Sequence, residues 1–476
     1  MKALKTVQFV VDKHLCTACG GCCGVCPEEA IRMEIDAYGI YTPIINLEKC
    51  SECGLCVQVC PGHEFNYWEY QERVFNTKEV DPAIGHCIDL WAGETTDPEI
   101  HYKSQSGGLI SAMLIYCLEK GIADGAVVTR WSKSDPFKPE VYIAKNREEV
   151  LDAVGSKYNP IPAAKILREL INLDGKYIFV GTPCQIQSLR KAEKLFPQLG
   201  KKVMLYLGLH CLSVFNYHYH DQIAHKIHKT KDNIAYFRFR DKAWRGWPCD
   251  MRLEDKDGNV YNLTGPFSRW WARSYFSNYR CKLCFDKFNE FSDISCGDCR
   301  VASKYGTTNL KDVYYKNNPG KSDIVIRSHR GKVLFDQLVH EGFFQAEPTE
   351  KSDVIKTVKV AEKKLGVNDF RSFARLFKLA YPYYGVKFVL SEPKDRAVDM
   401  LLKPWSVIAS AHYYVCHTWM KSSLFRSVLK RIPHKLLFVV SSARELPVSH
   451  VYFRRTTKII ANDFYDCPRT NDSNRT

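Results

Sequence analysis

The sequence lacks the long apolar runs of an integral membrane protein. Nowhere does it hold about 18 consecutive apolar residues, the length that a membrane-spanning helix needs. Residues 1–16 contain no sustained apolar segment of the kind found in secretory signal peptides. Low-complexity sequence is also scarce, because only the polar stretch 469–476 has the composition of a disordered segment. We therefore expect a soluble, cytoplasmic, globular protein.

Cysteine, by contrast, is abundant, with 20 among the 476 residues. Such a count can indicate a disulfide scaffold, but those scaffolds are usually short and secreted. This chain is long and carries its cysteines in C-x2-C groups, which favours metal binding in a reducing compartment. The length also exceeds that of one ordinary hydrophobic core, which predicts two or three domains.

Two stretches near the N-terminus repeat one cysteine pattern. The first is Cys16-x2-Cys19-x2-Cys22-x3-Cys26-Pro27, and the second is Cys50-x2-Cys53-x2-Cys56-x3-Cys60-Pro61. Both match the run of bacterial two-cluster ferredoxins, in which the fourth cysteine of each run binds the other cluster. We predict one [4Fe-4S] cluster on Cys16, Cys19, Cys22 and Cys60, and a second on Cys50, Cys53, Cys56 and Cys26.

Glycines accompany these thiolates, and one further cysteine lies among them. Gly20, Gly21 and Gly54 let the backbone turn tightly, so that amide N–H groups can point at the clusters. Cys23 is not needed in either ligand set. The alternative interpretation is a pair of zinc knuckles, but zinc sites rarely need four cysteines twice with a proline after each fourth one.

Apolar patterning beyond the cysteine runs predicts an α/β body. Helical spacing over 108–120 precedes an expected buried strand over 125–129, and further strands are expected over 176–180 and 203–207. We predict an α+β ferredoxin-like two-cluster module, an α/β domain and a mostly helical basic C-terminal extension. The boundaries place the module at 1–75, a linker at 76–98, the body at 99–345 and the extension at 346–476.

The basic charge of the chain is concentrated in its last part. The formal net charge is +15, and residues 361–476 hold 20 Lys and Arg against 9 Asp and Glu. Apolar residues at helical spacing, such as Phe370, Phe373 and Phe377, occur there among basic ones. We favour packing of these faces on the body, but such helices also lie on anionic membranes, so peripheral membrane contact stays an alternative. No nucleic-acid recognition motif accompanies the charge, so no nucleic-acid partner is expected.

A succession of short motifs in the body resembles one known family. The motifs are Ser104-Gln-Ser-Gly-Gly-Leu109, Gly155-Ser-Lys-Tyr158, Gly181-Thr-Pro-Cys-Gln185, Leu209-His-Cys211 and Cys281-Lys-Leu-Cys284. Over about residues 100–345 their order resembles that of the beta subunit of coenzyme F420-reducing hydrogenase and its dehydrogenase relatives. The resemblance implies FAD, a [4Fe-4S] cluster in the body, and electron exchange between a hydride carrier and iron-sulfur chains. Some members, such as reductases of sulfite and of 7-hydroxymethyl chlorophyll, carry attached ferredoxin domains.

The resemblance also implies the ligands of the third cluster, which are Cys184, Cys211, Cys281 and Cys284. A competing local interpretation is Cys281-x2-Cys284-x11-Cys296-x2-Cys299, which has the spacing of a zinc ribbon or a self-contained cluster site. We favour the family set, and whether Cys296 and Cys299 bind metal stays open. Asp293, Ser295, Gly297 and Asp298 fall where relatives carry a similar turn beside the flavin.

The same motifs supply the candidate flavin contacts, which are Ser106, Gly107, Gly108, Lys157, Tyr158, Thr182, Pro183 and Gln185. Ser106 to Gly108 precede a helix, whose unpaired N–H groups suit a pyrophosphate. Thr182 and Pro183 follow a strand, as ligand-binding turns in α/β sheets often do. The simpler alternatives are a plain helix cap at Ser106 and a surface lysine at Lys157. The sequence does not identify a catalytic residue.

Together these features predict an iron-sulfur, flavin-dependent oxidoreductase. A hydride carrier delivers two electrons at once and a cluster accepts one, so a flavin is needed between them. The expected redox partners are reduced F420, NAD(P)H, an organic substrate or ferredoxin, and partner subunits are possible. The alternative is a noncatalytic electron-transfer subunit of a larger redox complex.

Overall fold

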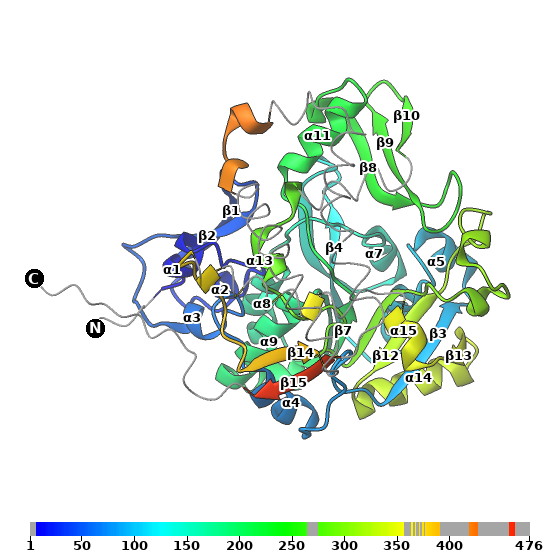
Figure 1. Ribbon diagram of the computed structural model, residues 1–476, viewed down its shortest axis with the longest axis horizontal. Helices are drawn as coiled ribbons and strands as arrows, with labels where there is room; N and C mark the ends of the chain where they lie inside the picture. Colours follow the sequence, from blue (N-terminus) through cyan, green and yellow to red (C-terminus); the bar gives the residue numbers. More distant parts are fainter. Residues whose placement is uncertain are drawn as a thin grey trace, which may run out of the picture.

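A mixed eight-stranded sheet forms the centre of the computed structural model (Figure 1), which describes residues 6–263, 275–356, 363–364, 367, 371, 374–375, 377–390, 418–426 and 457–461. The strand order is β13-β3-β12-β11-β7-β6-β4-β5. The strands are β3 (Asp89–Thr95), β4 (Gly125–Trp131), β5 (Pro139–Ala144), β6 (Tyr177–Gly181), β7 (Val203–Leu209), β11 (Ile294–Asp298), β12 (Ser322–Ile326) and β13 (Phe344–Pro348). The central strands β11, β7, β6 and β4 are parallel to one another, whereas the outer pairings are antiparallel.

Helices cover both faces of this sheet. One face packs against α6 (Leu109–Glu119), α7 (Arg147–Asp152) and α14 (His329–His340), and the other against α8 (Leu167–Asn172), α9 (Pro183–Leu195) and α10 (Leu199–Lys202). Successive side chains of a strand point to opposite faces, so Ile178 and Phe179 of β6 enter different cores. The body is therefore α/β, and the helix and three strands that the sequence predicts are present.

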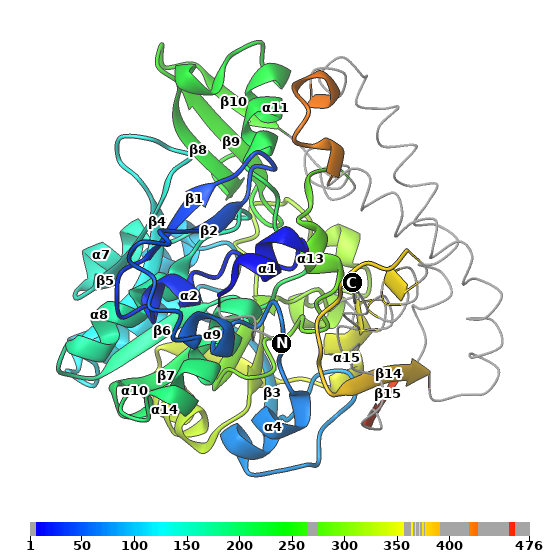
Figure 2. The same ribbon diagram turned by 90° about the vertical axis from the view of Figure 1, so that its left-hand side faces the viewer.

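The N-terminal module lies against the α8–α9 side of the body. It contains α1 (Gln8–Asp12), α2 (Gly21–Gly24), β1 (Ile31–Ile35), β2 (Tyr41–Ile45), α3 (Leu55–Gln58) and α4 (Tyr67–Phe75). Figure 2 shows the hairpin of β1 and β2 and the short helices on the surface of the sheet domain. Val25, Val59 and Phe65 of the module share one apolar core with Leu167 and Ile186 of the body. The module is thus packed onto the body over a continuous core.

The predicted linker 76–98 is not a free connection. It contains β3, which pairs with β12 on one side and β13 on the other. This strand thus belongs to the central sheet, and the sheet also extends past residue 345 through β13. The sequence-based boundaries at both ends of the body therefore differ from the boundaries of the sheet.

A smaller sheet is formed by the part of the chain between β7 and β11. It has the order β10-β9-β8 and consists of β8 (Ile234–Asp241), β9 (Asp250–Asp255) and β10 (Val260–Leu263). α11 (His218–Lys226) packs on it through Tyr219 and Ile223. The remaining elements are α5 (Pro98–Lys103), η1 (Ala163–Ile166), η2 (Lys231–Asn233), α13 (Tyr279–Lys282), η3 (Ala302–Tyr305), η4 (Leu310–Asp312) and α15 (Lys351–Lys356).

The described parts of the extension lie partly in the core. Val367 and Tyr384 are buried in the apolar core of the α9 side, as the packing alternative expects. Strands β14 (Val386–Leu390) and β15 (Thr457–Ala461) form an antiparallel pair. Phe377 and Leu424 are exposed, whereas Phe370 and Phe373 lie outside the described residues. No helix among the described residues has the length and apolar character needed to cross a membrane.

Candidate iron-sulfur and flavin sites

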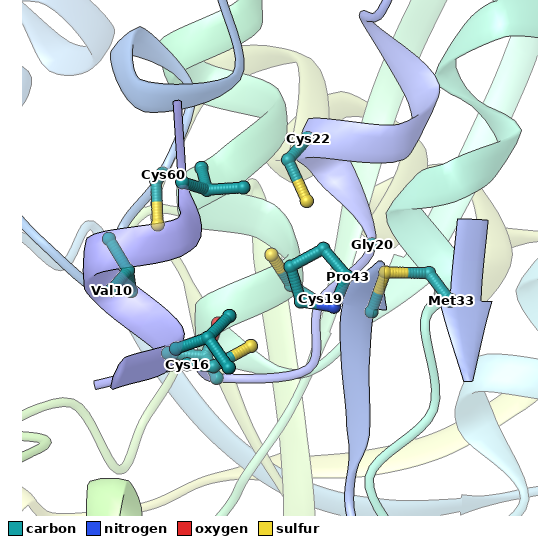
Figure 3. Close-up of a pocket in the computed structure, with 11 residues that line it drawn as sticks. Val10, Cys16, Cys19, Gly20, Cys22, Met33, Pro43 and Cys60 are labelled. Atoms are coloured by element: carbon teal, nitrogen blue, oxygen red, sulfur yellow. The ribbon is translucent and has the colours of Figure 1, made fainter. Parts of the chain in front are cut away.

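The first predicted ligand set, Cys16, Cys19, Cys22 and Cys60, lines one pocket. Figure 3 shows the four sulfur atoms pointing into the same space, with Val10, Met33 and Pro43 around them. Cys60 belongs to the second cysteine run, so the crossed arrangement of two-cluster ferredoxins is present here. We call these four residues the inner module set.

The second predicted set, Cys50, Cys53, Cys56 and Cys26, is called the outer module set. Cys26 and Cys56 are buried in one apolar cluster against which Cys50 packs. Burial raises the pKa of the Cys56 thiol, and the nearby Cys53 and Cys26 thiols raise it further. Cys53 is exposed, in contrast to the buried Cys19 and Cys22 of the inner set.

The backbone around both sets is built in the same way. Gly20 and Gly54 each precede a short helix with positive φ, +88° and +78°, which an L side chain rarely adopts. The amide of Ala18 lies 3.4 Å from Cys16 Sγ, and the amide of Ala30 lies 3.4 Å from Cys26 Sγ. Such N–H groups stabilise the negative charge of cluster thiolates. Cys23 donates to the Ile31 carbonyl at 3.0 Å, which agrees with its omission from both sets.

The start of α9 holds the first cysteine of the body. Thr182 caps this helix, its amide donates to Gln185 Oε1 at 2.7 Å, and Pro183 occupies the first helical turn. Cys184 therefore lies in the first turn, where the positive end of the helix dipole favours a thiolate. Gln185 Nε2 also donates to the Ile161 carbonyl at 2.8 Å, which fixes the neighbouring loop. Thr182, Pro183 and Gln185 thus position Cys184 directly.

The other cysteines of the body gather beside it, and we call Cys184, Cys211, Cys281 and Cys284 the body set. Burial raises the pKa of Cys184 well above its usual value, and the Cys19, Cys211 and Cys284 thiols nearby raise it further. Burial raises the pKa of Cys211 to about 12, and Cys281 and Cys284 contribute in the same direction. Thiols of this kind release their protons when a metal binds. The four residues implied by the family resemblance thus lie close together, and Cys19 lies near them.

Cys296 and Cys299, the two cysteines of the local alternative, have other neighbours. Cys296 packs in the core with Leu207 and Ile324, and Cys299 packs with Ala92 and Val301. Burial raises the pKa of the Cys296 thiol, and the Asp323 carboxyl nearby raises it further. The surroundings of Cys281 and Cys284 therefore favour the body set over the local one.

The zinc and cluster alternatives need different spacings of the thiols. Zinc needs its sulfur ligands within about 2.3 Å of one point, whereas a cubane holds them further apart. Among the described residues, no group of three or more His, Cys, Asp or Glu side chains has the arrangement of a single-ion site. The four sulfur atoms of the inner module set face one pocket, and we expect them to hold a cubane.

The predicted phosphate loop Ser106 to Gly108 lies at the start of α6. Ser106 Oγ donates to the Lys321 carbonyl, and the Gly107 amide donates to Ser322 Oγ at 3.0 Å. Gly108 is the N-cap residue with φ +74° and contributes no side-chain cap. The first amides of α6 therefore lack a side-chain acceptor, as an anion-binding helix start requires.

Lys157 and Tyr158 lie near this loop. Lys157 Nζ donates to the carbonyls of Ala153 at 2.6 Å and Gly155 at 2.9 Å, so the lysine is not simply a solvated surface residue. Burial, and to a smaller extent the Arg238 guanidinium, lowers the pKa of Lys157 to about 7. The Tyr158 ring packs edge-on against Phe239 with 5.3 Å between the ring centroids.

Arg240 of β8 connects these segments and was not found from the sequence. Its guanidinium donates to Asp298 Oδ1 at 2.9 Å and to the Gln105 carbonyl at 3.3 Å, and it lies 3.5 Å from the Tyr158 hydroxyl. The sequence pattern that could have indicated Arg240 is the alternation Phe237-Arg-Phe-Arg240. Such a strand carries basic residues on one face, which is unusual. Arg240 thus lies where the loop before α6 meets the segment of Lys157 and Tyr158. The other predicted flavin contacts, Thr182, Pro183 and Gln185, lie with Cys184 at the start of α9.

Comparison with known proteins agrees with this arrangement. Two profiles of the coenzyme F420 hydrogenase/dehydrogenase beta subunit match the chain, one for its N-terminal part over residues 90–168 and one for its C-terminal part over residues 174–352. The chain belongs to this family. A profile of 4Fe-4S dicluster domains matches residues 15–63, so the family body here carries an N-terminal iron-sulfur domain. The resemblance inferred from the motifs is confirmed.

Relatives in this family match most of the body. The coenzyme F420 hydrogenase subunit beta of Methanosarcina barkeri is 28% identical over 298 residues, which are 60% of this chain and 92% of the relative. One of the subunits of the F(420)H(2) dehydrogenase of Methanosarcina mazei is 24% identical over 383 residues, 78% of this chain and 96% of the relative. A chain in the structure of the F420-reducing [NiFe] hydrogenase complex from Methanosarcina barkeri aligns with a TM-score of 0.48 and 23% identity, covering 63% of this chain and 96% of that one.

Proposed function

We propose that this protein is an iron-sulfur flavoprotein that passes electrons between a hydride carrier and an external one-electron partner. The observation that carries the proposal is the proximity of Cys19 of the inner module set to Cys184 of the body set, since the two thiols interact electrostatically. It supports a continuous series of centres from the body through the module. Relatives named as F420 hydrogenase and F(420)H(2) dehydrogenase subunits make an F420-type carrier the first candidate.

Fixed docking of the module supports this transfer, because electron transfer slows steeply as the distance between centres grows. The amide of Ala164 donates to the Cys19 carbonyl at 2.8 Å, and Ser188 Oγ donates to the Val59 carbonyl at 3.2 Å. Arg280 Nη2 donates to the Pro61 carbonyl at 3.0 Å. These bonds reach the backbone next to the proposed ligands and hold it against the body.

The proposed order of centres is body set, inner module set and outer module set. The inner set lies between the other two, because Cys19 adjoins the body while the two module sets share the crossed cysteine runs. Cys53 of the outer set is exposed, so an external partner can approach this end of the series. A partner subunit or a ferredoxin would therefore exchange electrons there.

The segments around Arg240 suit FAD. FAD, when bound, exchanges a hydride with a carrier and passes electrons singly to a cluster. Lys157, Arg238 and Arg240 lie together and can bind its diphosphate, with the start of α6 as a further donor of N–H groups. Ile161, at the end of the loop that begins at Gly155, accepts a hydrogen bond from Gln185 at the start of α9, which supports a body cluster close to this region.

Anaerobic purification and reconstitution with iron, sulfide and FAD test this function. We expect one FAD and about 12 iron ions per chain, since each of three clusters holds about four, and reduction of the clusters by reduced F420 or NAD(P)H. Protein that binds the iron but no flavin, and that accepts electrons only from another protein, would instead be the noncatalytic electron-transfer subunit.

A pair of double variants tests the body ligands. C281S/C284S should lose about four iron ions per chain, because it removes half of the ligands of one cluster. C296S/C299S is the matched control, since it removes the same number of cysteines from the same part of the sequence, and it should keep all of the iron. Loss of about four iron ions in both double variants would instead favour the local ligand set, which shares Cys281 and Cys284 with the body set.

The pKa of Lys157 gives a further test of the flavin site. Because this pKa is lowered to about 7, the lysine loses its positive charge as pH rises through neutrality. FAD should therefore bind more tightly at pH 6 than at pH 9, by roughly tenfold for one lost charge–charge contact of about 1.4 kcal/mol. Equilibrium fluorescence titration at the two pH values measures the affinity for FAD. The variant K157M should bind weakly at both pH values, and an unchanged pH dependence in this variant would exclude the contact.

A further inference from the structure

A lysine from beyond the end of the family profile reaches the body set. The family profile ends at residue 352, whereas Lys363 lies in the extension, 152 residues from Cys211 in the sequence. Its Nζ donates to the Cys211 carbonyl at 2.8 Å and to the Asp286 carbonyl at 3.0 Å. The ammonium group is thus hydrogen-bonded to the backbone of a proposed ligand.

Two acceptors set the position of the Lys363 ammonium group. Both are backbone carbonyls, those of Cys211 and Asp286, and the ammonium form of lysine, which predominates at neutral pH, donates to them. A positive charge at this position opposes the negative charge that a cluster and its thiolates bring.

The next residue fixes the position of this segment. Lys364 forms an ion pair with Glu290 at 2.8 Å, and both side chains are fully buried. Lys364 also donates to the Pro82 carbonyl at 2.8 Å, and the Tyr67 hydroxyl donates to the other oxygen of Glu290 at 2.8 Å. Val367 lies in the apolar core nearby. The path of the chain at Lys363 is thus set by neighbours on the body and the module.

We propose that Lys363 is a positioning residue that raises the reduction potential of the body cluster. A reduced cluster carries one more negative charge than an oxidised one, so a fixed cation beside it stabilises the reduced state more. The segment that follows the family profile would then supply part of the redox site. This inference rests on the proposed function, because it requires a cluster on Cys184, Cys211, Cys281 and Cys284.

A second lysine of the body, which contacts the module, provides a matched comparison. Lys191 of α9 donates to the carbonyl of Cys60, an inner-set residue, at 3.1 Å and to the Glu64 carbonyl at 2.7 Å. Lys191 and Lys363 therefore hold the backbone of ligands from two different sets in the same manner. Neutralising each lysine should change a different centre.

The test is a redox titration of the full-length, cluster-loaded protein, followed by low-temperature electron paramagnetic resonance. In K363Q one of the three midpoint potentials should fall by at least about 59 mV, the value of a tenfold shift in a one-electron equilibrium. K363R keeps the charge and should leave that potential near the wild-type value. K191Q should lower the potential of another centre and leave the centre affected by K363Q unchanged.

Each outcome decides between the charge of Lys363 and its packing. Three unshifted potentials in K363Q with full iron content would overturn the inference, and so would an equal shift in K363R. If K363Q loses the protein fold, K363M carries the same expectation without a buried amide. Loss of about four iron ions in both neutral variants, with retention in K363R, would also support the charge, whereas loss in all three would show a packing role.

The iron content of C281S/C284S separates a failure of this inference from a failure of the proposed function. If that variant retains all of its iron, the body set is not a cluster and the premise is wrong. If it loses about four iron ions and K363Q shifts nothing, the cluster exists but Lys363 does not tune it.

Discussion

The two cysteine runs of the module share one sequence pattern but lie in different environments. A Cβ added at Gly20 would lie 2.7 Å from the Pro162 carbonyl oxygen, and one added at Gly21 would lie 1.9 Å from Ser188 Oγ. At Gly54, the counterpart of Gly20, nothing lies within 4 Å of an added Cβ. The same motif thus faces the body at one end and solvent at the other. Identical spacing of the cysteines thus does not give identical surroundings, since the body packs closely at Gly20 and Gly21 but not at Gly54.

Charge distinguishes the module from the rest of the chain. Residues 15–63 hold six Asp and Glu but two Lys and Arg, a net charge of −4 in a chain of +15. Bound clusters with four thiolates each add more negative charge. The solvent-facing end therefore favours a basic redox partner, because opposite potentials steer association.

Removal of one ligand from each run should have the largest effect. C19S should abolish transfer from the body to the module, since Cys19 adjoins Cys184. C53S should leave reduction of the body and inner centres intact but abolish transfer to a protein acceptor. Stopped-flow absorbance with a reduced hydride donor measures both, and we expect at least a hundredfold loss of the affected step, because a series cannot bypass a missing centre.

An equal loss of the first step in the two variants would contradict the order of centres. The iron content of each variant is the control, because each should lose about four iron ions per chain. A variant that keeps its iron has retained the cluster with a serine ligand and is compared by its potential instead.

Alanine at the paired glycines should have a smaller effect that differs between the runs. G20A introduces both an unfavourable positive φ and a collision with Pro162, so we expect a loss of about 3 kcal/mol in the free energy of unfolding. G54A meets only the positive φ and should lose about 1 kcal/mol. Urea unfolding of the two anaerobic proteins measures the difference. Equal losses of unfolding free energy in the two variants would mean that the body does not pack tightly against the first cysteine run.

A charge reversal at the exposed end should have the smallest effect. Glu48 lies beside Leu47, which is 79% exposed, and close in sequence to Cys53. E48K should slow electron transfer to cytochrome c, a basic one-electron acceptor, by roughly two- to fivefold at low salt and less at high salt. E119K reverses an exposed charge on α6 of the body and should change the rate little. Equal effects of E48K and E119K would exclude docking at the outer module set.

The module ligands can be proposed from the sequence alone because their spacing is local. Three cysteines of each set lie within seven residues, so the backbone alone brings them together. The body set needed the family resemblance, since Cys184 and Cys281 are distant in sequence and meet only in the folded sheet domain. Lys363 gave no signal, because a lysine among basic residues looks like a solvated one.

The predicted linker shows the same limit in the fold. β3 has a glycine and polar ends, which weaken its strand pattern, and both of its partners follow it by more than 200 residues. Pairing over such distances is decided by packing of the whole sheet. Helix α6 and strands β4, β6 and β7 were predictable because their apolar periodicity is strong and uninterrupted.

The position of β3 limits how the module can move. Residues 76–88 connect the module to this strand, which lies between two neighbours inside the central sheet. The connection is held to the body because Arg327 donates to the Ile84 and His86 carbonyls and Lys364 donates to the Pro82 carbonyl. Carrier domains that swing between donor and acceptor need a tether of free length. Here the iron-sulfur module is held in one position on the body, so turnover should not depend on solvent viscosity. Replacing the module with another one would require a new apolar surface on the part of the body that it covers.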